Sequence, residues 1–193
     1  DRPALRRKAG FSDQDIVLFT LTRLKSSEQY KGYDKVINAL PEVLKRYPTV
    51  KYLIGGKYDA EEKARLEQLI RELQLHDKVF FSGFVPDEDV EGLFTLADVY
   101  VMPSTGEGFG IVFIEALFYG KPVIAGNVDG SVDALDGGRF GLLVDPDNPM
   151  ELREAIFKAI EKREELAPRA EAVADRFGFE RYKEKLKAMI STG

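Results

Sequence analysis

The 193-residue chain contains no cysteine, has a single histidine, and carries no excess of positive charge. Without cysteine it has no disulfide framework and no thiolate chemistry. The net charge of -5 and the lack of a basic stripe argue against a nucleic-acid partner. No apolar run approaches the roughly 18 residues of a membrane span, and residues 1–8 do not read as a signal peptide. We therefore expect a cytoplasmic protein.

Two common nucleotide-binding motifs are also missing. A dinucleotide-binding domain would carry Gly-x-Gly-x-x-Gly after its first strand. Here the first apolar run continues into residues 22–27, Thr-Arg-Leu-Lys-Ser-Ser, which contain no glycine. A Gly-x4-Gly-Lys-Ser/Thr loop is absent as well. These absences argue against a hydride-transfer enzyme and a P-loop nucleotidase. The one histidine, His76, follows a helical segment, and we expect it at the surface and not as a base.

The segments that are present alternate between strand and helix. Apolar runs of strand length cover residues 16–22, 50–54, 79–82, 99–102, 122–125 and 141–144. Helical periodicity covers residues 33–47, 60–73, 86–96, 109–119, 149–162, 168–176 and 179–190. This alternation predicts an α/β fold with a doubly wound parallel sheet of about six strands and helices on both faces. Such a sheet binds ligands beyond the carboxyl ends of its strands.

Several polar or glycine-rich segments follow strands and so belong to that edge. Arg23 follows the first strand, Gly55 and Gly56 the second, and the run 103–110 the fourth. Within that run, Glu107 lies beside Gly106, Gly108 and Gly110, just before an apolar helix whose N-terminal amides suit an anion or hydroxyls.

Glu115 lies eight residues after Glu107, among Ile111, Val112, Ile114 and Leu117. A carboxylate in apolar surroundings is costly unless a polar group meets it. We therefore expect Glu115 to face a ligand, the alternative being a buried partner of Lys or Arg.

Four segments, taken in order, carry a family resemblance that extends from residue 16 to about residue 187. They are Thr22-Arg23-Leu24 with Lys31-Gly32; residues 79–86, Val-Phe-Phe-Ser-Gly-Phe-Val-Pro; residues 97–115, which end in a Glu-x7-Glu motif; and residues 120–125 with 141–146. Together they resemble the C-terminal, donor-binding domain of retaining glycosyltransferases of the GT-B fold, in group 1 (family 4-like). The loop 25–30 is longer than the family's usual pattern.

The resemblance implies a single nucleotide-sugar-binding domain over residues 1–193, the Rossmann-like half of a GT-B fold. Residues 164–193 would be its C-terminal helical tail. The chain would be the C-terminal half of a larger two-domain enzyme, whose missing N-terminal domain supplies the acceptor contacts and any membrane contact. The donor would be a nucleoside-diphosphate sugar such as a UDP- or GDP-hexose. No metal is expected, because the Asp-x-Asp sequences at 13–15 and 145–147 do not lie in a suitable place.

The resemblance also implies roles for individual residues in this chain. Arg23 and Lys31 would hold the donor diphosphate, where fixed positive charge stabilises the departing nucleotide. Glu107 would face the transferred sugar and act with them in catalysis. Glu115 would bind the ribose hydroxyls. The backbone from Gly108 through Phe109 and Gly110 to Ile111 would meet the sugar or the distal phosphate.

Two further pairs are implied, each with a structural alternative. Phe84 and Val85 would flank the nucleobase, or else only close a turn by apolar packing. Gly55 and Gly56 would let the donor pass close to the second strand, or else only end that strand. Residues 127–130 would border the sugar.

The implied function is transfer of a hexosyl group, with retention, to a carbohydrate or lipid-linked acceptor. One alternative is an isomerase half of the same architecture, such as a nucleotide-sugar 2-epimerase. Another is a binding module that is inactive as an isolated chain, because a two-domain cleft must close on its donor.

Overall fold

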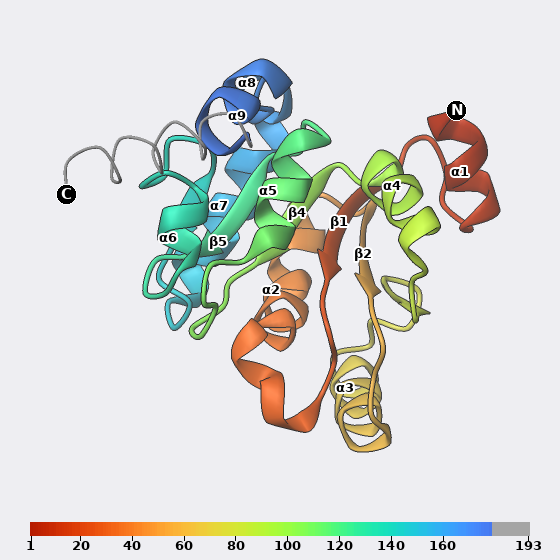
Figure 1. The fold of residues 1–193 in the computed structure, drawn as a ribbon. Coiled ribbons are helices and arrows are strands. Elements are labelled where there is room, and N and C mark those ends of the chain that lie inside the picture. Colours follow the sequence, from red (N-terminus) through yellow and green to blue (C-terminus); the bar gives the residue numbers. More distant parts are fainter. Residues whose placement is uncertain (179–193) are drawn as a thin grey trace.

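A parallel six-stranded sheet forms the centre of the molecule, in the order β3-β2-β1-β4-β5-β6. The computed structural model describes residues 1–178. The strands are β1 (Ile16–Leu21), β2 (Val50–Gly55), β3 (Val79–Gly83), β4 (Val99–Met102), β5 (Val123–Gly126) and β6 (Leu142–Val144). All run in one direction (Figure 1). The predicted doubly wound α/β fold is confirmed.

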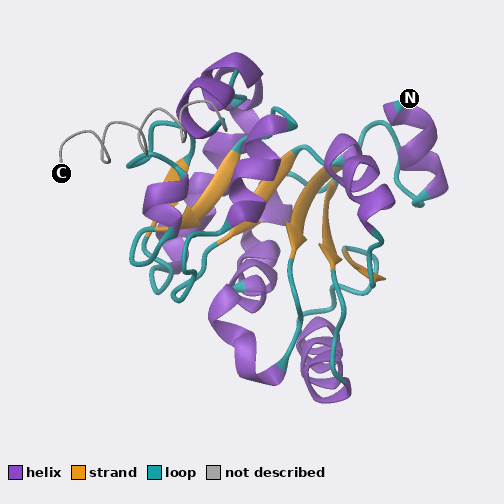
Figure 2. Ribbon diagram, viewed as in Figure 1, coloured by secondary structure: helices purple, strands orange, loops and turns teal. Residues whose placement is uncertain are grey.

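Helices enclose the sheet (Figure 2). They are α1 (Arg2–Lys8), α2 (Tyr33–Arg46), α3 (Ala60–Glu72), α4 (Asp87–Leu96), α5 (Ile111–Phe118), α6 (Ser131–Ala134), α7 (Pro149–Glu161), α8 (Arg163–Leu166) and α9 (Ala170–Phe177), with a 3-10 helix η1 at Ser26–Lys31. The predicted helix over 179–190 lies outside the described residues. His76 is exposed, as expected.

Two apolar cores, one on each face of the sheet, account for the strand sequences. In β4, Val99 and Val101 pack with α2, α3 and α7, whereas Tyr100 and Met102 pack with α4, α5, α6 and α9. Successive side chains of a strand point to opposite faces. Because helices cover both faces, the strand is apolar at every position.

Three local differences from the sequence-based expectation have physical causes. The α5 helix begins at Ile111 and not at 109, because Gly110 has a φ of 80° and a left-handed residue cannot belong to a right-handed helix. The α6 turn was not predicted; it is four residues long and begins where Asp129 accepts a hydrogen bond from the Ser131 N–H. The α1 helix, which lies before the first predicted element, is held by buried Arg6.

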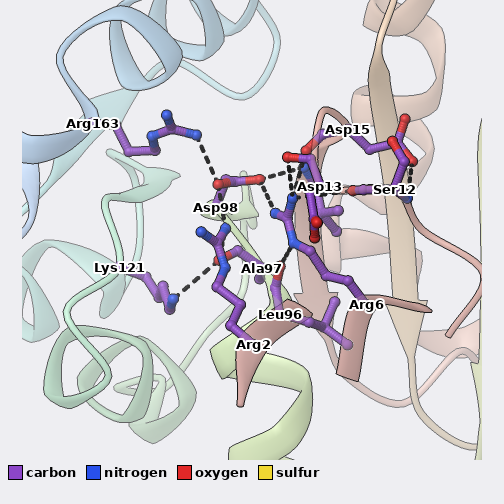
Figure 3. A network of polar contacts seen from close by, with 11 residues as sticks. Arg2, Arg6, Ser12, Asp13, Asp15, Leu96, Ala97, Asp98, Lys121 and Arg163 are labelled. Carbon is purple, nitrogen blue, oxygen red and sulfur yellow. Dashed lines mark hydrogen bonds and ion pairs between the residues drawn. The ribbon is translucent and has the colours of Figure 1, made fainter. Parts of the chain in front are cut away.

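Asp98, just before β4, joins four parts of the chain at the amino edge of the sheet. Its carboxylate accepts hydrogen bonds from the Val17 N–H at 2.8 Å and from Arg6 and Arg163, at 2.5 and 2.8 Å. Figure 3 shows these side chains converging on it, together with Arg2. Burial alone would raise the pKa of Asp98, but the Val17 N–H and the Arg6 and Arg2 guanidinium groups outweigh burial and hold the pKa below its usual value.

The order of the strands defines where a ligand site is expected. Chain connections move in opposite directions from β1 and β4, which are neighbours in the sheet. Loops that follow these two strands therefore separate and leave room between them, which is the point where doubly wound sheets bind ligands. Arg23 follows β1, and the run 103–110 follows β4.

We predict that Asp98→Asn lowers the free energy of unfolding by about 3 kcal/mol at pH 7, because it leaves the buried Arg6 cation without its anion. Denaturant titration measures the change. Asp77→Asn is the matched control, because Asp77 is exposed and pairs with Lys78 only at the surface; it should have an effect near zero.

The difference in free energy of unfolding between wild type and Asp98→Asn should become smaller at low pH. The pKa of Asp98 is lower in the folded than in the unfolded chain, so its contribution is fully present above the unfolded value of about 3.9. It is lost as the pH falls through the lower, folded value. The two unfolding curves should therefore approach each other below about pH 4. A loss no larger than that of the control at pH 7 would contradict the assignment.

Candidate functional site

A pocket of about 440 Å³ opens between the ends of β1 and β4. Its lining combines the end of β1, Lys31, the loop that carries Glu107 and the first turn of α5: Leu21, Thr22, Arg23, Lys31, Met102, Glu107, Phe109, Gly110, Ile111 and Val112. Six of the residues assigned to the donor site from the sequence, from Arg23 to Ile111, therefore line one pocket.

Lys31 and Glu107 form an ion pair in this pocket, although 76 positions separate them in the sequence. Their side chains are only 11% and 12% exposed. An ion pair shielded from water is stronger than a surface pair but costs more desolvation. The pair therefore places one positive and one negative group side by side in a site that is largely shielded from solvent.

Close backbone contact brings the segments of Lys31 and Glu107 together. The Thr105 N–H donates to the Tyr30 carbonyl at 2.9 Å. Gly32 has a φ of 75°, and a Cβ there would lie 2.3 Å from the Pro103 carbonyl oxygen, so only glycine fits. The "Lys-Gly" pattern in the sequence thus has a steric cause: the residue after Lys31 must let the loop after β4 approach.

Buried Glu62 of α3 anchors the segment that precedes Lys31. Its carboxylate accepts hydrogen bonds from the Tyr33 hydroxyl at 2.8 Å, from Arg65 at 2.6 Å and from Gln29 at 3.0 Å. Burial would raise the pKa of Glu62, but Arg65 and Tyr33 outweigh it and lower the pKa. The η1 turn and the start of α2 are therefore tied to α3.

Arg23 lies at the rim of the pocket. Its side chain is 65% exposed and pairs with Glu28 at 3.1 Å. The second carboxylate oxygen of Glu28 is buried without a hydrogen-bond partner among the described residues. The Glu28 side chain is only 12% exposed, so the pair meets solvent on its Arg23 side alone. The Arg23 guanidinium, which also lines the pocket, is therefore the member of the pair that an anion in the pocket can reach.

The first turn of α5 brings backbone donors to the same pocket. Gly110 precedes the helix in a left-handed conformation, and a Cβ there would meet the Phe113 ring at 2.4 Å. The N–H groups of Ile111 and Val112 lie in the first helical turn, where the helix offers them no preceding carbonyl. The turn therefore presents donors and a partial positive charge.

On its other side, the Glu107 loop is held by the turn after β5. Asp129 accepts hydrogen bonds from the Glu107 N–H and from the Ser104 hydroxyl, both at 2.7 Å. The Gly130 N–H donates to the Glu107 carbonyl at 2.9 Å. The sequence indicated residues 127–130 only as a border of the sugar, and the sole signal for this contact was the Asp129-Gly130 pair in the short turn after β5.

The expectation that the Glu115 side chain lies in apolar surroundings is wrong. Its apolar neighbours in the sequence suggested a carboxylate in apolar surroundings, but the Glu115 side chain is exposed on α5. Of the apolar neighbours, Leu117 is buried on the opposite face together with Phe113 and Ala116, whereas Ile111 is itself 69% exposed. Glu115 does not line the pocket that contains Glu107.

Phe84 and Val85 lie outside the pocket of Lys31 and Glu107. They line a second pocket of about 440 Å³, between α1, α4 and the turn after β3, which also includes Leu5 and Lys8. Phe84 is 72% exposed. The turn is thus not closed by packing of Phe84, which leaves this aromatic ring available at the surface.

Gly55 and Gly56 do not line the pocket of Lys31 either, and Gly56 has a structural reason of its own. Its φ is 136°, and a Cβ would lie 1.7 Å from the Thr22 carbonyl oxygen. The carboxyl ends of β1 and β2 therefore come together only because position 56 is glycine.

At Gly108, in contrast, a Cβ would meet no atom within 4 Å.

Over the part of the chain that the structure describes, no group of three or more His, Cys, Asp or Glu side chains is placed to hold a metal ion. Among the same residues, no helix combines the length and the apolar character needed to cross a bilayer.

Comparison with known proteins agrees with the geometry. The family described as "Glycosyl transferases group 1" matches residues 1–175. Mannosylfructose-phosphate synthase of Agrobacterium fabrum is 34% identical over 163 residues, which are 81% of this chain and 35% of that protein. D-inositol 3-phosphate glycosyltransferase of Corynebacterium jeikeium is 34% identical over 160 residues, 80% of this chain and 38% of that protein.

A solved structure extends the likeness to the fold. Anabaena Alr3699/HepE, in complex with UDP and glucose, superposes with a TM-score of 0.85 at 28% identity, over 100% of this chain and 52% of that one. The chain thus spans less than half the length of the two curated relatives and about half of this structure. The match over residues 1–175, together with the sheet order and the pocket, shows that the chain belongs to the group 1 glycosyltransferases, as a domain of the GT-B type.

Proposed function

We propose that this chain is the donor-binding domain of a retaining glycosyltransferase, which binds a nucleoside-diphosphate sugar for transfer of its hexosyl group to a carbohydrate or lipid-linked acceptor. The supporting observation is the convergence of Arg23, Lys31, Glu107 and the first turn of α5 in one pocket at the β1–β4 edge. A diphosphate needs fixed cations and backbone donors, and a sugar needs hydroxyl acceptors. This pocket offers each of these groups.

In this proposal the two cations hold the diphosphate. The planar guanidinium of Arg23 suits bidentate contact with phosphate oxygens, and Lys31 adds a point charge. Both act most strongly on the negative charge that develops as the nucleotide leaves. A bound diphosphate competes with Glu107 for Lys31, so the Glu107 carboxylate becomes available to hydroxyl groups of the transferred sugar.

The proposed donor is a UDP-hexose, with a GDP-hexose as the alternative. The HepE structure, which covers the whole of this chain, contains UDP and glucose. The exposed Phe84 ring and the Val85 backbone are proposed to flank the base, and exposed Glu115 to accept from the ribose hydroxyls. This arrangement requires an extended ligand that reaches beyond the Lys31 pocket toward Phe84.

We further propose that residues 1–193 are one half of a two-domain enzyme and that a missing N-terminal domain binds the acceptor. The chain's share of its relatives, from 35% to 52%, supports this division. The pocket is open at one side, where Arg23 is 65% and Ile111 is 69% exposed. Because catalysis needs this side to be closed against water, the isolated chain should bind donor without transferring sugar.

The first prediction from this proposal is that the chain binds UDP or GDP, and the matching sugar nucleotide, in isothermal calorimetry. The same ligand should raise the melting temperature, because it binds only the folded state. Failure of UDP, GDP, UDP-glucose and GDP-mannose to bind at millimolar concentration would refute the proposal.

A second prediction concerns Arg23. Arg23→Ala should weaken binding of the free nucleoside diphosphate by about 10-fold, the usual scale for one hydrogen bond to a charged group. Arg7→Ala is the matched control, because Arg7 is an exposed arginine of α1 outside the described pocket. Equal affinities of the two variants for the nucleotide would exclude Arg23 from the diphosphate site.

A third prediction tests Glu115. Because Glu115 is exposed, Glu115→Ala should leave the melting temperature nearly unchanged while it weakens nucleotide binding by about 10-fold, through loss of a charged acceptor. Glu164→Ala, at an exposed acid of α8, is the control and should change neither quantity. Unaltered affinity in Glu115→Ala would remove Glu115 from the ribose site.

A further inference from the structure

The turn after β5 contains a carboxylate that the proposed function has not used. Asp129 is half-buried, and its two oxygens accept three hydrogen bonds: from Ser104 Oγ and the Glu107 N–H at 2.7 Å, and from the Ser131 N–H at 2.9 Å. Ser104 and Ser131 are fully buried. A carboxylate with this many protein donors is a poor acceptor for a ligand, so its effect is on the groups that it holds.

Those groups control the position of Glu107. The Asp129 carboxylate fixes the Glu107 N–H, and the next residue, Gly130, donates its own N–H to the Glu107 carbonyl at 2.9 Å. Both polar groups of the Glu107 backbone are therefore held by two consecutive residues that follow a different strand. On the opposite side, the Thr105 N–H is held by Tyr30.

The turn after β5 and the loop after β4 lie too close together to admit a side chain between them. A Cβ on Gly130 would lie 2.0 Å from the Gly108 carbonyl oxygen, and one on Gly126 would lie 2.0 Å from that of Ser104. The two turns thus pack backbone against backbone. Beside the backbone hydrogen bond from the Gly130 N–H to the Glu107 carbonyl, the Asp129 side chain supplies the acceptor for the Glu107 N–H.

Charge supports the same role. Burial would raise the pKa of Asp129, but the hydrogen bonds from Ser104, Ser131 and the Glu107 N–H outweigh it, and the pKa lies below its usual value. Asp129 is therefore ionised at neutral pH, and a hydrogen bond to an ionised acceptor is about twice as strong as a neutral one.

We propose that Asp129 is a positioning residue for Glu107: it holds the Glu107 backbone so that the side chain meets the transferred sugar, and it thereby determines the preference for a sugar nucleotide over the free nucleotide. This inference rests on the proposed function. It assigns Asp129 no contact with the donor.

Two measurements on the 193-residue chain test the proposal with Asp129→Ala, Asp129→Asn and the control Asp133→Ala. Asp133 is an exposed acid four residues further on, in α6. The first measurement is hydrogen exchange of the amides of residues 103–112, with those of β2 as a reference for global unfolding. The second is calorimetry of UDP-glucose and UDP, and of GDP-mannose and GDP.

In Asp129→Ala the Glu107 amide should exchange about 10-fold faster, the scale of one lost hydrogen bond to a charged group, while β2 amides stay unchanged. Affinity for the sugar nucleotide should fall by about 10-fold, and affinity for the free nucleotide by less than about 2-fold. Asp129→Asn should lie between wild type and Asp129→Ala, because its amide keeps one acceptor oxygen. Asp133→Ala should match wild type.

The opposite results separate the two proposals. If wild type binds neither sugar nucleotide, the proposed function fails, and the role of Asp129 fails with it. If wild type binds but Glu107 exchange is unchanged in Asp129→Ala, only the positioning role is overturned. It is overturned as well if exchange rises while both ligands weaken equally, because Asp129 would then be merely structural. Should Asp129→Ala not fold, Ser104→Ala, which removes one of the three donors to Asp129, should change the same ratio in the same direction by a smaller factor.

Discussion

Burial of both faces of the parallel sheet is the constraint on which the rest of this molecule depends. Strand β4 is apolar at every position, and β1 at every position except Thr20, because α2, α3 and α7 cover one face and α4, α5, α6 and α9 the other. An ionised group therefore has a place only at the two edges where strands begin or end. Asp98 gathers its arginines at the amino edge, and Lys31, Glu107 and Asp129 lie at the carboxyl edge.

The two edges use charge for different ends. At the amino edge, Asp98 is surrounded by donors on all sides and ties α1, β1 and α8 together. At the carboxyl edge, the Lys31–Glu107 pair faces a pocket, and Arg23 pairs with Glu28 at its rim. A satisfied network stabilises the fold, whereas a pair beside an open pocket leaves charges that a ligand can meet.

Much of the site was predictable because carboxyl ends of parallel strands meet at one edge. This rule alone places Arg23 and the 103–110 run near each other, and the family resemblance adds Lys31. The roles that the resemblance implies for these residues stay predictions. The surroundings of Glu115 were not predictable from its neighbours. On a helix, residues adjacent in sequence point about 100° apart, so an apolar neighbourhood along the chain does not bury the residue between. The hydrogen bond from the Glu107 N–H to Asp129 joins turns 22 residues apart, and no local sequence pattern predicts such a contact.

The sequence by itself determined the fold class, the alternation of six strands with the longer helices, and the segments that meet at the carboxyl edge. Periodicity and strand length are local properties, and they suffice for those conclusions. Tertiary structure alone decided that Lys31 pairs with Glu107 and that Phe84 belongs to a different pocket. It also decided that Asp129 holds the loop after β4, which carries Glu107. These outcomes depend on how closely separate backbones approach. That distance is set by glycines such as Gly32 and Gly130, where a Cβ would collide with a carbonyl oxygen of another segment. The sequence does not show which segment that is.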